Sequence, residues 1–147
     1  MNLAYIAGLI DGEGSIGFTK SRSAMIPRVS ITSTDLTLLE KVKNDHGGRV
    51  QKLSRHNPGW KPGYSWIITN YPAVSFVCEI EKWLQIKQDQ CLLLYAWDSI
   101  RPGRGHAWSK ERLDALSLLN DQSKWLNWRG VNRPLLSPVD VFLNKCG

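Results

Sequence analysis

Glu13, which lies between two glycines near the start of the chain, is placed where a bound cation would stabilise its carboxylate. Residues 3–14 read LAYIAGLIDGEG. Leu3, Ile6 and Ile10 recur at three- and four-residue spacing, which predicts a helix with these side chains in the core. Because glycines fit the left-handed turn that ends helices, we expect the helix to stop around Glu13. A carboxylate there meets the negative end of the helix dipole, so a nearby cation would stabilise it.

The same helix carries a stripe of residues with almost no side chain. Ala4, Gly8 and Gly12 recur at every fourth position. A glycine inside a helix costs roughly 0.5–1 kcal/mol relative to alanine, so two of them indicate that another backbone approaches closely. If that backbone is a second copy of the helix, two Glu13 carboxylates converge and raise each other's pKa unless a cation lies between them. Such a cluster of oxygens suits Mg²⁺, which commonly binds one or two carboxylates together with phosphate oxygens.

Residues 6–14, IAGLIDGEG, resemble the signature motif of the LAGLIDADG homing endonucleases at eight of nine positions. In that family the last acidic residue of the motif binds the catalytic divalent metal. The resemblance therefore implies that Glu13 is catalytic, that Glu13 and Gly12 hold the metal, and that the cofactor is Mg²⁺, with Mn²⁺ or Ca²⁺ able to take its place. It implies no small-molecule cofactor. The alternative is that a helix of small residues followed by a glycine-rich turn serves packing alone.

Two further catalytic candidates come from the same resemblance. Residues 84–90, LQIKQDQ, are similar to the family segment after the third helix. Lys87 matches the lysine that lines the active-site solvent pocket and stabilises charge at the scissile phosphate; the alternative is an ordinary exposed lysine. Ser33 aligns where some relatives carry a glutamine near the attacking water, but serine is shorter and departs from that pattern.

The motif occurs once, which resembles the homodimeric branch of the family. A symmetric contact fits this, because one surface patch can complement itself across a two-fold axis. The resemblance implies an interface made of Ala4, Ala7, Gly8, Asp11 and Gly12.

Composition favours a polyanionic partner. The chain has 147 residues, enough for one domain with a sizeable core, and carries a net charge of +6. Residues 14–34 and 46–78 contain no acidic residue, and both stretches carry several lysines and arginines.

The apolar stretch of residues 3–10 is about half of the ~20 residues that a membrane span needs, so we expect no membrane partner. Three widely spaced cysteines predict free thiols in a reducing intracellular compartment, either the cytoplasm and nucleoid or an organelle matrix.

The patterns along the chain predict an α+β fold. After the first helix, residues 15–22 and 27–33 alternate as strands, and a helix runs from 34–35 to the glycines at 47–48. Strands at about 49–54 and 64–69 follow, then helices from 71, at 88–100 and from 109. This αββαββα order with a twisted antiparallel sheet is that of the LAGLIDADG family. We therefore expect an endonuclease domain over residues 1–123 and an irregular tail over residues 124–147 that packs back onto it.

The predicted strands and their connections present basic and polar side chains that suit a saddle over the DNA major groove. The alternative is a solvated sheet face. The candidate DNA-binding residues are Lys20, Arg22, Arg28, Ser30, Thr32, Arg49, Gln51, Lys52, Arg55 and Lys61.

The resemblance implies a site-specific, intron-encoded endonuclease that acts as a homodimer on double-stranded DNA. It would make a metal-dependent double-strand break in a long, pseudo-palindromic target and leave 3′ overhangs. Two alternatives from other classes use the same scaffold without cleavage, namely an RNA maturase and a DNA-binding regulator. A purely structural oligomer that uses the stripe alone does not explain the acid-free basic strands, and the presence of Glu13 favours the enzyme.

Overall fold

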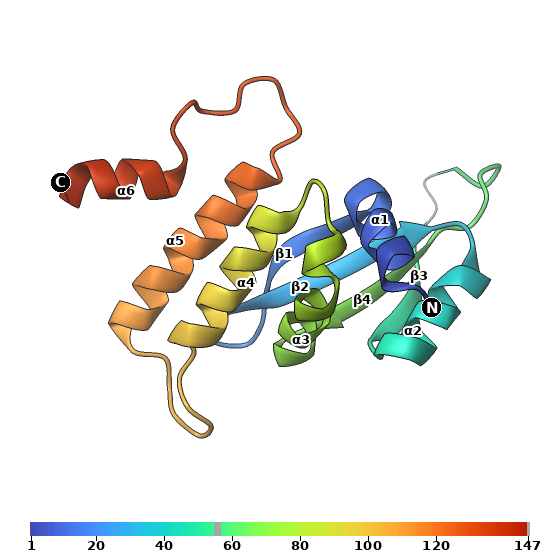
Figure 1. Cartoon of the computed structure of the whole chain (residues 1–147), viewed down its shortest axis with the longest axis horizontal. Coiled ribbons are helices and arrows are strands. Elements are labelled where there is room, and N and C mark those ends of the chain that lie inside the picture. Colours follow the sequence, from blue (N-terminus) through green and yellow to red (C-terminus); the bar gives the residue numbers. More distant parts are fainter. Residues whose placement is uncertain (55–56, 147) are drawn as a thin grey trace.

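The computed structural model describes residues 1–54 and 57–146. Its strands form a single antiparallel sheet in the order β1-β2-β4-β3 (Figure 1). The strands are β1 (Gly14–Lys20), β2 (Met25–Ser33), β3 (Arg49–Lys52) and β4 (Tyr64–Thr69). The helices are α1 (Leu3–Glu13), α2 (Leu36–His46), α3 (Tyr71–Ile80), a 3₁₀ turn η1 (Glu81–Trp83), α4 (Gln88–Ile100), α5 (Lys110–Leu126) and α6 (Pro138–Cys146). This order confirms the predicted αββαββα arrangement.

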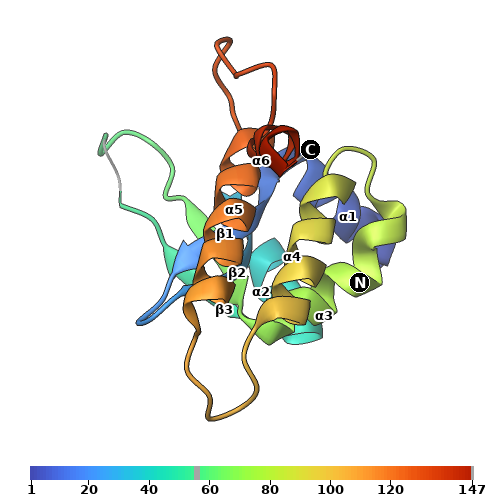
Figure 2. The ribbon, with the colours of Figure 1, turned by 90° about the vertical axis from the view of Figure 1, so that its left-hand side faces the viewer.

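The helices are distributed unequally around the sheet. α1 and α4 contact β1 and β2, and α3 contacts β2 and β4. In Figure 2 these three helices lie on one side of the sheet, while α5 lies along the β1 edge. The other face of the sheet carries the alternate, mainly polar positions of the strands. Among the described residues, no helix is both long and apolar enough to cross a membrane.

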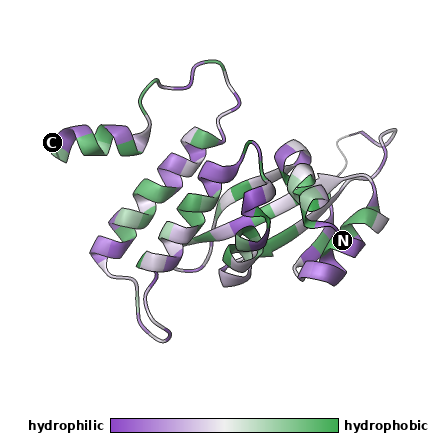
Figure 3. Ribbon diagram, viewed as in Figure 1, coloured by the Kyte–Doolittle hydropathy of each residue, from purple (hydrophilic) through white to green (hydrophobic). Residues whose placement is uncertain are grey.

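The core lies between the sheet and the helices that cover it. Ile16 pairs with Val29 across β1 and β2, and Ile31 pairs with Trp66 across β2 and β4. All four side chains are fully buried, and full burial of an aliphatic side chain contributes about 1.5–3 kcal/mol. The Trp66 indole N–H donates to the carbonyl of Gly47 at 2.8 Å, so its polar atom is satisfied. Figure 3 shows that α5 and α6 carry both hydrophobic and hydrophilic residues.

Gly14 is where α1 turns into β1, and the structure corrects the reason for a glycine there. We expected a left-handed turn, but Gly14 has φ −109° and ψ 178°, which is extended backbone. A Cβ at this position would lie 2.8 Å from both the Ile10 Cα and the Ser30 carbonyl oxygen. Glycine is therefore required because the end of the helix and strand β2 approach it too closely for any side chain.

The segment 124–147 is not irregular throughout, contrary to the prediction. Residues 124–126 complete α5, so the predicted domain boundary falls inside that helix, and residues 138–146 form α6. Ser137 and Asp140 cap α6 reciprocally: the Ser137 N–H donates to Asp140 Oδ2 at 3.1 Å and the Asp140 N–H donates to Ser137 Oγ at 3.2 Å. Such a capping box is a local sequence signature of a helix N-terminus, and the prediction of an irregular tail overlooked it. The segment packs on α5, where the Trp125 indole donates to the Pro134 carbonyl at 2.9 Å.

We predict that Gly14→Ala destabilises the fold by about 1–3 kcal/mol, the usual cost of overpacking, because backbone atoms on two sides cannot move away. Gly63→Ala is the matched control, since a Cβ there meets the Leu53 Cδ1 at an ordinary 3.5 Å. Urea unfolding at a fixed protein concentration measures both. Equal midpoints for the two variants would show that the junction tolerates a side chain.

Candidate nucleic-acid interface and metal site

The end of α1 is tied to the turn before α4 by hydrogen bonds in both directions. The Asp11 carboxylate accepts the backbone N–H groups of Gln85, Ile86 and Lys87 at 2.7, 3.2 and 3.1 Å. Lys87 Nζ donates to the carbonyls of Ile10 and Asp11 at 2.9 and 2.8 Å. The ammonium thus adds a donor to two carbonyls in the last turn of α1, of which that of Ile10 also accepts the Gly14 N–H, and it opposes the negative end of the helix dipole. The carboxylate satisfies three N–H groups in the turn before α4.

This arrangement places Lys87 at the same helix end as Glu13. Its carbonyl partners belong to residues two and three positions before Glu13. Burial lowers the pKa of Lys87; the Asp11 charge acts in the opposite direction and the Arg129 charge lowers the pKa further. Lys87 is therefore held in place as a cation of reduced basicity beside the motif.

Glu13 is exposed, and its carboxylate has no hydrogen bond or ion pair with any described residue. Gly12, the other predicted ligand, offers only its main chain. Within the described residues no three His, Cys, Asp or Glu side chains form a metal-binding group. One free carboxylate fits Mg²⁺ in a site that is completed by water, phosphate oxygens or a second chain, because Mg²⁺ is commonly held by one or two carboxylates.

The Ser33 hydroxyl takes part in a local hydrogen bond at the end of β2. Its Oγ accepts the backbone N–H of Asp35 at 3.0 Å, just before α2 begins. Serine commonly makes such local bonds at turns and helix starts. A hydroxyl held in this way serves the β2–α2 connection, so the structure gives no support to its predicted catalytic role.

The predicted interface residues do not all lie on the same face of α1. Ala4, Gly8 and Gly12 are exposed, and a Cβ built on either glycine would meet nothing within 4 Å. Ala7 is fully buried in the core of its own chain, so placing it on the interface was wrong. Asp11 is partly exposed and its carboxylate accepts backbone N–H groups of residues 85–87, so its place on the interface stays a prediction. Ala7 lies one residue from the stripe, which turns its side chain by about 100° to the buried side.

The strand register separates the predicted DNA-binding residues into groups. Arg28 and Thr32 of β2 lie on the face opposite Val29 and Ile31, and Gln51 pairs with Ser65 beside Thr32. By strand register Lys20 and Lys52 belong to the face that the helices cover, but each lies at the end of its strand and is exposed. The remaining predicted residues are Arg49, which shares the open face, Arg22 in the β1–β2 turn, Lys61 in the β3–β4 connection, and Arg55, which lies outside the described residues.

Ser30 does not present its hydroxyl to a ligand. The side chain is buried, with 7% of the residue exposed, and its Oγ lies 2.9 Å from the Oγ of Ser15. The bond joins β1 to β2 on the open face. The predicted DNA contact by Ser30 is therefore corrected to a role in strand pairing.

The basic residues around the open face are not neutralised by acidic partners. Ion pairs within the described residues join Met1 to Asp45, His46 to Glu79, and Arg101 to Asp98. None involves a basic residue of the sheet or of its connections. These cations are consequently available to phosphate groups, which provide most of the affinity in protein–DNA complexes.

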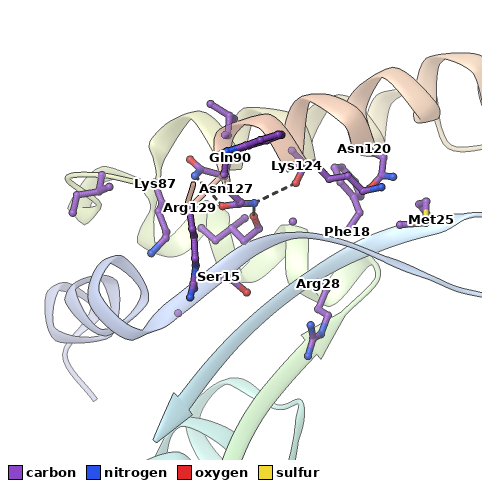
Figure 4. A pocket seen from close by; sticks show the side chains of 17 residues that line it. Ser15, Phe18, Met25, Arg28, Lys87, Gln90, Asn120, Lys124, Asn127 and Arg129 are labelled. Carbon is purple, nitrogen blue, oxygen red and sulfur yellow. Dashed lines mark hydrogen bonds between the residues drawn. The ribbon is translucent and has the colours of Figure 1, made fainter. Parts of the chain in front are cut away.

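The structure adds basic residues that the sequence patterns did not select. Lys124 and Arg129, from the segment expected to be an irregular tail, line a cavity of about 460 Å³ together with Arg28 and Lys87 (Figure 4). Their only signal in the sequence is that they follow the predicted helix from 109, and that signal does not indicate which residues they approach.

Comparison with known proteins gives the following findings. Residues 1–81 match the model of the LAGLIDADG-like domain. The fold is similar to that of the homing endonuclease I-CvuI in complex with its target in the presence of Ca (TM-score 0.71, 19% identity, 98% of this chain and 90% of that chain covered). It is also similar to that of the archaeal intron-encoded homing endonuclease I-Vdi141I complexed with DNA (TM-score 0.69, 21% identity, 97% of this chain and 94% of that chain covered). The K262A mutant of I-SmaMI is similar with a TM-score of 0.66 and 20% identity, over 92% of this chain and 53% of that chain. No curated protein matches.

We predict that Asp11→Ala destabilises the fold by about 0.5–2 kcal/mol, as the loss of a helix-capping carboxylate does. Three N–H groups before α4 would lose their acceptor. Asp114→Ala on α5 is the control, because Asp114 is exposed and makes no hydrogen bond or ion pair with a described residue. Chemical unfolding at one protein concentration gives the free energy of unfolding of both variants. An Asp114→Ala loss as large as that of Asp11→Ala would show that the Asp11 hydrogen bonds do not stabilise the fold.

Proposed function

The chain belongs to the LAGLIDADG-like family, and from this premise we propose that it is a homing endonuclease that hydrolyses phosphodiester bonds in double-stranded DNA. The observation that carries the proposal is Glu13, an exposed carboxylate without a partner among the described residues at the end of a helix that Lys87 caps. The I-CvuI and I-Vdi141I structures, which share the fold, are complexes with DNA, and this supports the choice of substrate.

DNA binding is assigned to the open face of the sheet and its connections. Arg28 and Arg49 lie on that face, and Lys20, Lys52 and Lys61 surround it without an ion pair to any described acidic residue. Arginine and lysine can read guanine edges, and Gln51 can bond adenine in the major groove. The other cations would contact phosphates and fix the position of the protein on the duplex.

A homodimer through α1 is proposed because the glycine stripe has no use within one chain. None of the described residues would touch a Cβ at Gly8 or Gly12, so the helix surface is open to another backbone. Large apolar side chains are exposed close to this surface, namely Tyr5 on α1, Trp83 in η1 and Ile86 in the turn that Asp11 holds. Two copies related by a two-fold axis would bring two Glu13 carboxylates together and match a pseudo-palindromic DNA target.

Glu13 of each copy would hold a divalent ion, most simply Mg²⁺, with the Gly12 main chain beside it. When bound, such an ion lowers the pKa of a coordinated water and offsets charge that develops on phosphate. Lys87, fixed on the carbonyls of Ile10 and Asp11, would stabilise negative charge at the scissile phosphate. The outcome we propose is a double-strand break with 3′ overhangs.

A reducing compartment inside the cell is proposed as the place of action. Cys78, Cys91 and Cys146 are free thiols, and burial raises the pKa of Cys91 to about 12, which makes that thiol unreactive.

We predict that Glu13→Gln lowers the cleavage rate by about 100-fold or more, since loss of even an outer partner of a metal ligand costs 10–100-fold. DNA affinity in EDTA should hold or rise, because a negative charge near phosphate is removed. Substrates are duplexes selected from a randomised library by binding, then cut in Mg²⁺ under single-turnover conditions. Glu111→Gln, an exposed position on α5, is the control.

Unchanged cleavage by Glu13→Gln would place the metal elsewhere. Binding without cleavage by the unaltered protein, in any divalent ion, would instead support the maturase or regulator hypothesis.

We predict that Gly8→Leu converts the dimer to a monomer while the fold is kept, because the added side chain meets open space within its own chain. Thr37→Leu, which adds the same side chain at an exposed position of α2, should remain dimeric. Light scattering gives the mass and circular dichroism the fold. A Gly8→Leu protein that stays dimeric and still cuts DNA would exclude the stripe as the interface.

A further inference from the structure

The cavity of about 460 Å³ lies between β1, the turn before α4 and the C-terminal end of α5 (Figure 4). Four of the side chains that line it are cationic, namely Arg28, Lys87, Lys124 and Arg129. No Asp or Glu is found among the described residues of its lining. A cavity with this charge favours an anionic ligand over a neutral or cationic one.

Buried amide and hydroxyl groups fix the end of α5 at this cavity. Asn127 Nδ2 donates to the Ile16 carbonyl at 3.1 Å, which satisfies an acceptor on the edge strand β1. Gln90, 6% exposed, donates from Nε2 to Asn127 Oδ1 at 3.3 Å. Gly17 leaves room for this contact, because a Cβ there would lie 3.0 Å from Ser123 Oγ. Arg129 follows two residues after Asn127 and is therefore carried by an anchored segment.

The Arg129 guanidinium lines the same cavity as Lys87 and has no partner among the described residues. Figure 4 shows both side chains extending toward the junction of α1 and β1, near Ser15. Arg129 makes no hydrogen bond or ion pair with any described residue. The positive charge of Arg129 helps to lower the pKa of Lys87, against the effect of Asp11, whose carboxylate is occupied by three backbone N–H groups. Two cations this close repel each other unless an anion lies between them.

We infer that Arg129 and Lys87 together bind one phosphate of the DNA backbone beside Glu13, so that the C-terminal segment completes the nuclease site. The planar guanidinium can bind two phosphate oxygens at once, and the lysine acts as a point charge. This inference rests on the proposed function. It assigns to the DNA a residue that lies well outside the matched residues 1–81.

Arg129→Gln tests the inference, with Arg133→Gln as the matched control. Arg133 belongs to the same segment and loses the same charge, but its guanidinium lies over the Trp125 ring at 4.0 Å and does not line the cavity. We expect Arg129→Gln to weaken duplex binding by about tenfold, as the loss of one charge-assisted hydrogen bond does. The slope of log K against log salt should fall by about 0.9 for each lost contact, and the cleavage rate in Mg²⁺ should fall as well. Arg133→Gln should change neither slope nor rate.

The outcomes separate the inference from the proposed function. If the unaltered protein binds and cuts duplex DNA and Arg129→Gln behaves like Arg133→Gln, only the role of Arg129 is overturned. If the unaltered protein does not bind duplex DNA at all, the proposed function fails and the inference fails with it. A second measurement requires no variant: titration with inorganic phosphate should shift the NMR signals of the Lys87 ammonium and Arg129 guanidinium more than those of Lys110, an exposed lysine of α5 outside the cavity. Equal shifts at all three would overturn the site.

Discussion

The Asp11–Lys87 tie at the end of α1 is the interaction on which the rest of the site depends. A helix C-terminus repels carboxylates, yet this chain places two of them there, at positions 11 and 13. The Asp11 carboxylate accepts N–H groups of the turn before α4, and the Lys87 ammonium donates to the carbonyls of Ile10 and Asp11. The same bonds fix a cation at the helix end that carries the exposed Glu13 carboxylate.

The two faces of α1 differ, because one is packed in the core and the other is exposed and lined with small residues. Ile6, Ala7 and Ile10 belong to the core, and the exposed face carries Gly8 and Gly12 with nothing of its own chain above them. Small residues within a core would create voids, whereas on an open helix surface they allow another backbone to approach closely. Gly14 differs from both, because atoms of Ile10 and Ser30 surround it. Three glycines in one motif therefore have two distinct physical reasons.

Helix α5 covers an edge of the sheet. β1 is an edge strand, and unpaired backbone groups on such a strand invite pairing with other chains. α5 lies along this edge, and Asn127 bonds the Ile16 carbonyl. Covering the edge also brings Lys124 and Arg129 to the cavity beside Lys87. Protection of the strand and the cationic cavity thus arise from the same packing.

Although it missed the end of α5 and the whole of α6, the sequence by itself determined the other elements and the position of Glu13, because helix and strand periodicities and the motif are local properties. It did not determine the partners of polar side chains. Asp11 bonds a backbone 74 residues away, and Ser33 bonds Asp35 where a catalytic role was expected. Nor did it place Arg129, whose position depends on the contact of Asn127 with a strand 111 residues earlier. Such choices follow from which surfaces the packed core brings together, and only the tertiary structure decided them.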